Sequence, residues 1–577
     1  MKHRWLVAEP QPLLTRPLSE QLKVSPLLAQ CLVNRGHTDP ARAGTFLEPR
    51  LKALADPFLL PDMAVAVERL FAARAAREPL VIFGDYDVDG VTATTILETG
   101  LTALGWTVHH YLPHRMDEGY GLSQAGVENC LGRFQVNLLL AVDCGSTAVS
   151  QIAWLRDQGV DVLVLDHHQV SDPAPLAVAL VNPQRAAPGA PNFRELCSAG
   201  LAFKLLHAVL KHGRALGLAA FDRADLKEHL DLVALGTIAD LVPLVGENRI
   251  LVTAGLQRLE TTRRPGIVAL KEVSQTRSPI GVYEVGFQLG PRLNAAGRLE
   301  TAEAALDLLL APDEATALPI AQALDATNRE RQTIEKQMAD DAVGVVRSKF
   351  RPEEHFVIVE GHLHWHIGVV GIVASRVLRE FYRPTIILGG DNEHWRGSGR
   401  SVAGFDLAAA LRECDDLLVR HGGHAMAAGV TIQPDKVDAF RQRLNEVAKR
   451  SLGNDTMIPE LRLDAIVPLR DLTIEAVTEL QKLAPFGQQN PAIQICIPSV
   501  TNALSPQKLG RGQQHWRFRI TDGVAQMDAL WWGAVTEGLP VPTGTFDVAA
   551  VPQVEEFNGR RMVRLRFLAW RPAAAAQ

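Results

Sequence analysis

Residues 80–95 read LVIFGDYDVDGVTATT, and they set a pattern that the first half of the chain repeats. Four apolar residues, Leu80 to Phe83, are typical of a strand buried on both faces of a parallel sheet, and Val91 to Leu104 predict a helix. The turn between them holds three carboxylates within five residues, namely Asp85, Asp87 and Asp89. Carboxylates this close repel one another unless a cation lies among them, and Mg²⁺ and Mn²⁺ take such oxygen ligands. A solvated acidic turn is the alternative, because short acidic turns are common.

Two further strand-like segments end in acidic or imidazole side chains. Residues 137–142 lead into Asp143, and residues 161–165 lead into the triplet Asp166-His167-His168. Strands and helices alternate from about residue 60 to about residue 260, which predicts a parallel sheet whose ligands collect at the strand ends. The side chains expected to share one crevice are therefore Asp85, Asp87, Asp143 and His167. Carboxylates mixed with histidine suit Mn²⁺ or Mg²⁺ better than zinc.

Asp240 follows a nearly uncharged segment, Leu232 to Ala239. A carboxylate in such a segment is expected to be buried, and a buried charge needs a partner or a metal. A helix cap or a salt bridge is the alternative role. Together with the carboxylates at the strand ends, Asp240 would complete a two-metal site, in which ions ~3.5–4 Å apart promote in-line displacement at phosphorus.

The composition indicates a folded protein of several domains. The chain has 577 residues, 47% of them hydrophobic, and a net charge of −6, which favours three or four domains and argues against a generally basic surface. The six cysteines form no CxxC pair and no zinc spacing, which is typical of reduced thiols in a cytoplasmic protein. The sequence indicates neither a signal peptide nor a membrane span.

Basic and glycine-rich segments outside this sheet are candidates for binding an anion. Residues 113–121 predict a loop that places Arg115 among glycines, with a polar connector as the alternative. Residues 290–300 predict a second loop, which would present Arg292, Asn294 and Arg298 to a phosphodiester backbone. A capped helix start with structural arginines is the alternative there. A long helix over residues 315–350 would then link this part of the chain to the next.

The second half of the chain predicts another α/β domain and a β domain. Residues 366–376 would open a helix whose free N–H groups can take a phosphate. The sequence GSGRS at 397–401 predicts a loop, because its glycines permit close backbone approach. Residues 515–520 and 561–567 alternate apolar residues with arginine, which favours an OB-type barrel that binds single strands by charge and stacking. Its candidate contacts are Trp516, Arg517 and Arg519. Arginines on an ordinary solvated strand face are the alternative.

Four motifs, in this order, resemble the DHH phosphoesterase superfamily. They are DYDVDG at 85–90, VDCG at 142–145, DHH at 166–168 and ADLVPL at 239–244. Three later segments resemble its single-stranded-DNA-specific exonucleases, so that the resemblance covers essentially the whole chain: GPRLNAAGRL at 290–299, GSGRS at 397–401 and GGHAMAAG at 422–429.

The resemblance implies an α/β fold in which a parallel-sheet DHH domain and a DHHA1-type domain are joined by a long helix and followed by a β-barrel OB-type domain. The boundaries are the DHH domain at 56–315, the linking helix at 316–350, the DHHA1-type domain at 351–455 and the OB-type domain at 456–577. Residues 1–55, where prolines separate short helical pieces, predict an N-terminal arm packed on the main domain.

The resemblance also implies a role for each matching residue. The divalent metals would be held by Asp85, Asp87, Asp143, His167 and Asp240, with Asp143 between two ions. Asp166 would orient a histidine, His168 would face the scissile phosphate, and the catalytic set would include Arg292 and Asn294. The 5′ end would be held by Arg115, Ser398 and Arg400, with Arg298 also on the substrate, and His424 would reach the active-site phosphate from the second domain. Some members place a metal-binding histidine where this chain has Phe83.

The activity implied is 5′→3′ hydrolysis of single-stranded DNA to mononucleotides with Mg²⁺ or Mn²⁺, in recombination and repair, by a cytoplasmic monomer. Single-strand-binding protein and repair helicases are the implied protein partners. Two alternatives stay open: a small-substrate phosphoesterase that cleaves short oligonucleotides, and a non-enzymatic single-strand-binding scaffold. The basic β region argues against the first, and the complete set of carboxylates argues against the second.

Overall fold

A computed structural model of the chain describes residues 3–114, 118–119, 121–186, 193–299, 301–390, 393–453, 457–557 and 559–573. The chain forms two compact units. Unit 1 holds residues 1–47, 333–484 and 492–577, and unit 2 holds residues 48–332 and 485–491. Within the described ranges, every helix is too short or too polar to span a lipid bilayer.

Unit 2 is built on a five-stranded sheet in which every neighbouring pair is parallel. The strand order is β3-β2-β4-β5-β6. The strands are β2 (Leu80–Phe83), β3 (Val108–Tyr111), β4 (Leu138–Val142), β5 (Asp161–Leu165) and β6 (Ala179–Val181). Since β3 and β4 flank β2 on opposite sides, the strand order reverses at β2, and ligands of open α/β sheets bind at such a point.

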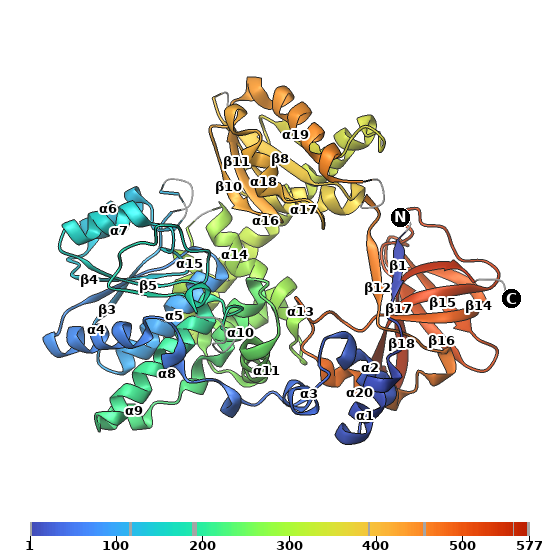
Figure 1. Cartoon of the computed structure of the whole chain (residues 1–577), viewed down its shortest axis with the longest axis horizontal. Helices are drawn as coiled ribbons and strands as arrows, with labels where there is room; N and C mark the ends of the chain where they lie inside the picture. The colour runs from blue at the N-terminus through green and yellow to red at the C-terminus, as the bar shows by residue number, and fades with distance from the viewer. Residues whose placement is uncertain are drawn as a thin grey trace. The chain divides into compact units, whose positions relative to one another are not determined.

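Helices cover both faces of this sheet (Figure 1). Leu80 and Ile82 pack against α4 (Met63–Ala76), α5 (Val88–Ala103) and α8 (Ser198–Ala215). Val81 and Phe83, which point to the opposite face, pack against α6 (Gln124–Arg133) and α7 (Val149–Asp157). The strand is therefore buried on both sides, as its unbroken apolar run predicts.

The rest of unit 2 is helical. Its helices are α9 (Ala219–Arg223), α10 (Leu230–Ala239), α11 (Gly246–Thr261), α12 (Pro265–Ser274), α13 (Val282–Glu284), the π-helical turn η5 (Val285–Leu289), α14 (Gly290–Leu299), α15 (Glu303–Leu310) and the first part of α16 (Glu314–Lys349). The loop predicted at 290–300 is wrong, since α14 spans that segment. Its glycines suit a turn, but here Gly297 allows the helix to lie against the first carboxylate turn, where a Cβ would come within 2.9 Å of the Tyr86 carbonyl oxygen.

Unit 1 contains a mixed sheet of order β10-β11-β9-β8-β7. Its strands are β7 (Ile358–His362), β8 (Thr385–Gly390), β9 (Trp395–Arg400), β10 (Arg420–His424) and β11 (Ala427–Ile432), and its helices are α17 (Val370–Phe381), α18 (Leu407–Arg412) and α19 (Val437–Ser451). The loop predicted at 397–401 is wrong, because these residues form most of β9. Gly397 lies in a strand interior because its neighbours are close: a Cβ there would overlap the Leu388 side chain.

A second sheet of unit 1, of order β13-β14-β15-β16-β18-β17, closes on itself through an additional β14–β17 pairing. Its elements are β13 (Ala465–Ile466), β14 (Ile495–Leu509), β15 (His515–Thr521), β16 (Gln526–Trp531), β17 (Phe546–Phe557) and β18 (Arg560–Pro572), with α20 (Ile474–Leu480) beside them. The closure agrees with the predicted OB-type barrel.

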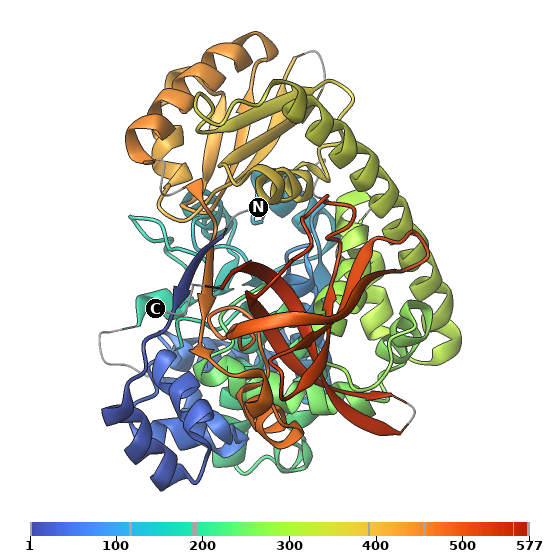
Figure 2. The ribbon, with the colours of Figure 1, turned by 90° about the vertical axis from the view of Figure 1, so that its right-hand side faces the viewer.

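Residues 1–47 of the N-terminal arm belong to unit 1, whereas residues 48–55 belong to unit 2, where Ala55 N donates to Glu247. The predicted packing on the main domain therefore holds only for the end of the arm. Strand β1 (Arg4–Val7) pairs in parallel with β12 (Glu460–Leu463), and Figure 2 shows the two side by side. The arm continues as α1 (Pro12–Leu22), α2 (Pro26–Asn34) and α3 (Pro40–Leu47). The arm is held there because β1 alone would leave its backbone N–H and C=O groups unpaired, and pairing with β12 satisfies them.

Candidate metal centre

Three strands of unit 2 deliver acidic side chains to one edge of the sheet. Asp85 follows β2, Asp143 follows β4 and Asp166 follows β5, and all three are buried. Asp143 has a φ of 63°, a backbone angle that residues other than glycine rarely adopt. Backbone strain of this kind occurs at functional sites, where the surrounding structure holds the residue in place.

The side chains at this edge form three overlapping groups whose ligand atoms lie within 4.8 Å of one another. The groups are Asp85 with Asp87 and Asp143, Asp143 with His167 and His168, and Asp89 with His167 and Asp240. Asp143 and His167 each belong to two groups, so the three groups form one continuous site. This arrangement suits two ions side by side, with Asp143 able to serve both.

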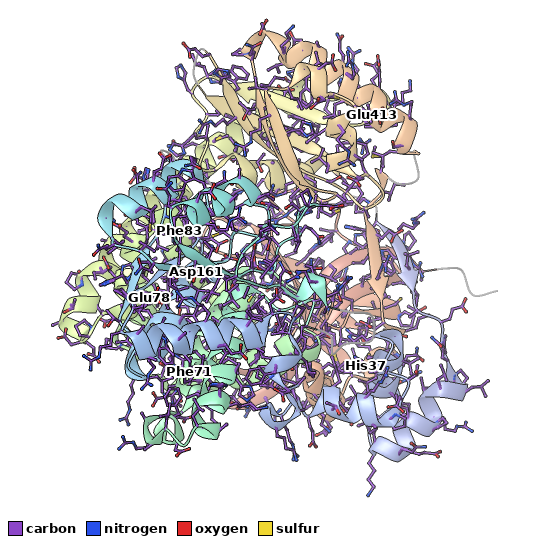
Figure 3. All side chains as sticks on the ribbon, turned by 60° about the vertical axis from the view of Figure 1, so that its left-hand side comes forward. His37, Phe71, Glu78, Phe83, Asp161 and Glu413 are labelled. Carbon is purple, nitrogen blue, oxygen red and sulfur yellow. The ribbon has the colours of Figure 1, made fainter. Side chains whose placement is uncertain are left out.

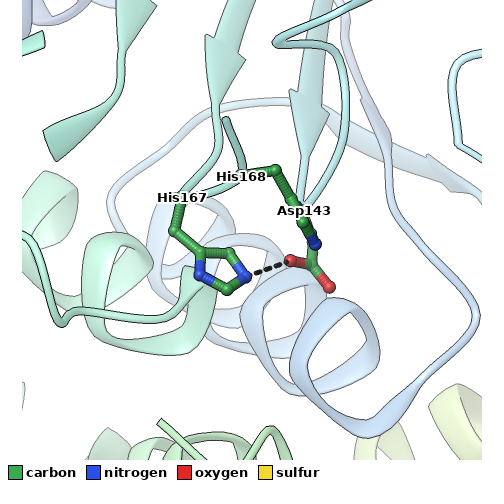
Figure 4. Close-up of side chains that lie close together, drawn as sticks. All are labelled: Asp143, His167 and His168. Atoms are coloured by element: carbon green, nitrogen blue, oxygen red, sulfur yellow. Dashed lines mark ion pairs between the residues drawn. The ribbon is translucent and has the colours of Figure 1, made fainter. Parts of the chain in front are cut away.

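His167 points its Nε2 atom at three carboxylates. The atom lies 3.4 Å from Asp143 Oδ1, the pair drawn in Figure 4, and 3.6 Å from Asp240 Oδ2 and 3.9 Å from Asp89 Oδ2. Among the described residues it has no hydrogen-bond partner. Burial lowers the pKa of His167, which favours the neutral ring with a lone pair to offer. A neutral, buried imidazole nitrogen among carboxylates is the donor set of a metal site.

The carboxylates of the site repel one another. Burial and the neighbouring carboxylates, first among them Asp89, raise the pKa of Asp143 well above its ordinary value. Burial and the charges of Asp89 and Asp87 raise the pKa of Asp240 to about 9. These groups ionise at neutral pH only if a positive charge lies among them, so the residues present fit a divalent cation.

Asp166 and His168 form an orienting pair beside this site. The Asp166 carboxylate accepts hydrogen bonds from Ser146 N at 3.0 Å, from His167 N at 2.8 Å and from the His168 ring at Nδ1, 2.8 Å away. Burial works against ionisation of Asp166, but these bonds and the nearby histidines hold its pKa below the ordinary value. Burial also works against protonation of His168, yet the bond to Asp166 raises the pKa of that ring to about 9. The raised pKa favours the protonated ring.

Asp89 belongs to the acidic turn that the sequence singled out, but the predicted set of metal ligands omitted it. Its buried carboxylate accepts hydrogen bonds from the N–H groups of Ser198 at 2.6 Å and Ala199 at 2.8 Å, the first residues of α8. The hydroxyl of Ser198 donates to Asp143 Oδ1 at 2.8 Å. The signal for Asp89 was present, since it is the third acid of the same Asp-x-Asp-x-Asp turn. Ser198 carries no sequence signal, because only the fold brings α8 to β4.

Phe83 stands outside the metal site. Phe83, labelled in Figure 3, is fully buried. Its ring centroid lies 5.3 Å from that of Tyr111, on the face of the sheet that α6 and α7 cover. The position at which some superfamily members carry a histidine therefore contributes to the core here, and the metal donors come from the remaining strand ends.

Helix α14 touches the first carboxylate turn. Asn294 Oδ1 accepts a hydrogen bond from Val88 N at 3.2 Å, which fixes the start of α5 next to Asp87. Arg292 pairs through Nε with Asp325 at 2.8 Å and donates from Nη1 to the Gln288 carbonyl, so these donors hold α14 in place. The side chain of Arg298 and the whole of Arg115 lie outside the described residues.

Unit 1 holds a compact basic site of its own. Arg400 Nη1 donates to Ser398 Oγ and to the Gly399 carbonyl, each at 2.8 Å. Both side chains lie against the first turn of α17, where a Cβ on Gly371 would come within 3.0 Å of Arg400 Nη2 and 3.1 Å of Ser398 Oγ. Burial lowers the pKa of Arg400. A guanidinium beside a hydroxyl and a helix N-terminus are groups that can hold an anion, and this role stays a prediction.

The basic face predicted on the barrel is largely paired within itself. Arg517 and Arg519 both reach Asp528 on the neighbouring strand, at 2.6 and 2.8 Å. Trp516 is half-buried with the Lys508 ammonium 5.5 Å from its ring. These contacts favour the alternative of structural arginines, and a role in binding DNA stays a prediction. The role of His424, an exposed residue of unit 1, also stays a prediction.

Three family models match the chain. They are the DHH family N-terminal domain at residues 79–237, the DHHA1 domain at 354–450 and the RecJ OB domain at 463–568. The single-stranded-DNA-specific exonuclease RecJ of Bacillus subtilis (strain 168) is 37% identical over 574 residues, covering 98% of this chain and 70% of that protein. The chain belongs to the RecJ family.

Solved RecJ structures share the whole fold. The structure of RecJ from Thermus thermophilus in complex with Mn²⁺ has a TM-score of 0.84 and 32% identity, covering 99% of this chain and 80% of that one. The complex of RecJ with Mg²⁺ from the same organism has a TM-score of 0.78 and 30% identity, covering 99% and 79%. These RecJ structures confirm the family resemblance and the α/β fold with an OB-type domain.

Proposed function

We propose that the chain hydrolyses single-stranded DNA from its 5′ end to mononucleotides, with Mg²⁺ or Mn²⁺, in DNA recombination and repair. The observation that carries the proposal is the buried site of carboxylates and His167 in unit 2, complete in a chain that belongs to a family of single-stranded-DNA-specific exonucleases. A degenerate scaffold would be expected to have lost some of these side chains.

The ions would be held by Asp85, Asp87, Asp143, His167 and Asp240, with Asp89 added to the predicted set. When bound, divalent cations supply an activated water and neutralise charge on the phosphodiester. Asp143 belongs both to the ligand group with Asp85 and Asp87 and to the one with His167, so it links these two groups.

His168 and Asp166 are proposed to act on the scissile phosphate rather than on the metal ions. The raised pKa of His168 favours the protonated ring, and its bond to Asp166 fixes the direction of the ring. The other ring nitrogen, Nε2, is the proposed donor to a phosphate oxygen as charge develops there. Asn294 keeps the first carboxylate turn in place from α14 and is a positioning residue.

The anion site of unit 1 is proposed to take the 5′-terminal phosphate. Ser398, Arg400 and the N-terminus of α17 supply a hydroxyl, a guanidinium and backbone N–H groups within one unit. Arg115, Arg298 and His424 are further proposed contacts from the family resemblance.

The proposal extends to a cytoplasmic monomer that works with single-strand-binding protein and repair helicases. Six buried, free thiols support a reducing compartment.

The test is digestion of single-stranded DNA labelled at the 5′ or the 3′ end, with Mg²⁺, with Mn²⁺ or with EDTA. Asp143→Ala removes the shared donor, and Asp157→Ala, at an exposed position in α7, is the matched control. Early release of labelled mononucleotide from the 5′ label only, abolished by EDTA and by Asp143→Ala, is expected, with a blunt duplex resistant.

Other results would point elsewhere. Cleavage of short oligonucleotides with long strands left intact would support the small-substrate phosphoesterase. Binding of the strand without any cleavage would support the scaffold.

A further inference from the structure

Two aromatic rings stand exposed on one short helical segment of unit 2. The side chains of Tyr283 in α13 and Phe287 in η5 are 63% and 69% exposed. Their ring centroids lie 5.0 Å apart with an angle of 28° between the planes, so the rings are stacked on each other. Exposing large apolar rings together is unfavourable in water, and a paired exposure of this kind marks a surface that binds something.

The segment that carries the rings is held firmly. Val285 and Leu289 on its inner side are fully buried. At its start, Gly281 N donates to Glu284 Oε2 at 2.9 Å, and near its end the Gln288 side chain accepts from Thr276 Oγ1 at 2.8 Å. The rings are thus presented by a fixed backbone, which lowers the entropy lost when a partner binds.

The same segment is continuous with the metal centre. It runs directly into α14, whose Asn294 bonds the first carboxylate turn at Val88. The π-helical turn also packs against the end of α10, where a Cβ on Gly286 would lie 4.0 Å from Ile238 Cγ2, two residues before Asp240. Single π-helical turns of this kind are frequent at functional sites.

We propose that Tyr283 and Phe287 form a stacking platform for the bases of the single strand that enters the metal centre. This inference rests on the exonuclease function proposed above. Every base offers a flat π-face, so such a platform binds any sequence, as an exonuclease requires. Phe287 carries no hydrogen-bonding group in its side chain, which fits stacking and excludes base-specific readout by that ring.

The test measures binding without turnover. In EDTA, the affinity of the full chain is compared for a labelled single strand and for the same strand with abasic sites in place of its bases. The wild-type protein is expected to prefer the strand that carries bases. The double variant, Tyr283→Ala with Phe287→Ala, is expected to lose that preference and to bind the normal strand on the order of tenfold more weakly. Phe287→Trp keeps a ring and should keep the preference, and Leu176→Ala, an equally exposed apolar position of unit 2, should behave as wild type.

A second measurement locates the contact. A strand that carries 5-iododeoxyuridine is irradiated on the protein, and crosslinks at residue 283 or 287 are expected. In turnover with Mn²⁺, the double variant should raise KM with little change in kcat. Unchanged discrimination against the abasic strand, or crosslinks confined to other segments, would overturn the platform.

The two proposals fail in different ways. If the wild-type protein cleaves no strand but still prefers bases and crosslinks at these rings, the platform stands and the exonuclease function fails. If it cleaves from the 5′ end and the double variant discriminates as wild type does, the function stands and the platform fails.

Discussion

Asp89 shows how one side chain joins helix architecture to the metal centre. Its carboxylate accepts the first N–H groups of α8 and also lies in a ligand group with His167 and Asp240. Burial raises the pKa of Asp89, and the nearby His167 counters that effect. The same carboxylate thus has two roles, as a cap of α8 and as a candidate metal ligand. A carboxylate at a helix N-terminus is stabilised by the N–H groups it meets, and it keeps a lone pair for a cation.

Asp89→Asn should therefore reduce metal affinity while the fold survives. The amide keeps one acceptor for α8 but removes the charge, and we expect Mn²⁺ affinity to fall about 10–100-fold. Calorimetric titration of Mn²⁺ into chelator-treated protein measures this, with Asp157→Asn as the exposed control. Mn²⁺ binding as tight as in wild type would restrict Asp89 to its helix-capping role.

His110 provides a pH-dependent contribution to stability through its contact with Glu98. Its Nδ1 lies 2.8 Å from Glu98 Oε2, and this hydrogen bond, with the charges of Glu98, Asp307 and Glu303, raises the pKa of the ring against the effect of burial. A raised folded-state pKa gives stability that is present below the ordinary value of 6.5 and is lost as the pH rises through the folded-state value.

His110→Gln should destabilise the protein by about 0.5–1 kcal/mol at about pH 5.5 and by less at about pH 9. Urea unfolding at both pH values measures the difference. His109→Gln, at the exposed neighbouring position, is the control. An equal loss at both pH values would mean that the ring acts by shape alone.

At the scale of elements, the anion site of unit 1 depends on how closely β9 approaches α17. Gly371 leaves room for Arg400 and Ser398 beside the first turn of the helix, and a methyl group there would force these side chains to move by a few tenths of an ångström. Because Arg400 is bonded to Ser398 and to Gly399, it has little freedom to adjust.

Gly371→Ala is expected to weaken recognition of the 5′ phosphate. The KM of a 5′-phosphorylated strand should rise about tenfold, the effect of losing one charge-assisted hydrogen bond, while a 5′-hydroxyl strand is little affected. Gly344→Ala in α16, where nothing lies within 4 Å of the added carbon, is the matched control. An equal effect on both strands would place the 5′ phosphate elsewhere.

At the scale of the whole molecule, the N-terminal arm and the C-terminal part of the sequence are joined within unit 1. Arg35, at the end of α2, pairs with Asp464 at 2.7 Å in a nearly buried contact, and Asn34 donates to the Asp464 carbonyl at 2.8 Å. Asp464 lies between β12 and β13, so the arm supports the strands that lead into the barrel.

Arg35→Ala leaves the Asp464 carboxylate without this guanidinium and should destabilise unit 1 by about 3 kcal/mol. Hydrogen exchange of the full chain is expected to speed up in β12 and β13, while β2 and β4 of unit 2 exchange as before. Arg42→Ala, on the exposed face of α3, is the control. Faster exchange throughout both units would show that they unfold together.

The sequence by itself determined the strands, the ends at which they deliver acids, and the chemistry of those acids. Unbroken apolar runs such as Leu80–Phe83 identify buried parallel strands, and the carboxyl ends of such strands share one edge. The position of Asp85, Asp143 and His167 in one crevice therefore follows from the sequence alone. The family follows from the same motifs.

Only the tertiary structure decided how glycine-rich segments fold and which side chains pair across the chain. Residues 290–299 form a helix and residues 397–400 a strand. Their glycines include positions where a neighbouring element leaves no room for a Cβ, such as Gly297 beside Tyr86 and Gly397 beside Leu388, and local turn propensity does not register such packing. Contacts such as Asp89 with Ser198, Arg517 with Asp528 and Arg35 with Asp464 join residues distant in sequence or on different strands. Periodicity reports what one segment buries, whereas partners are chosen when the segments pack together.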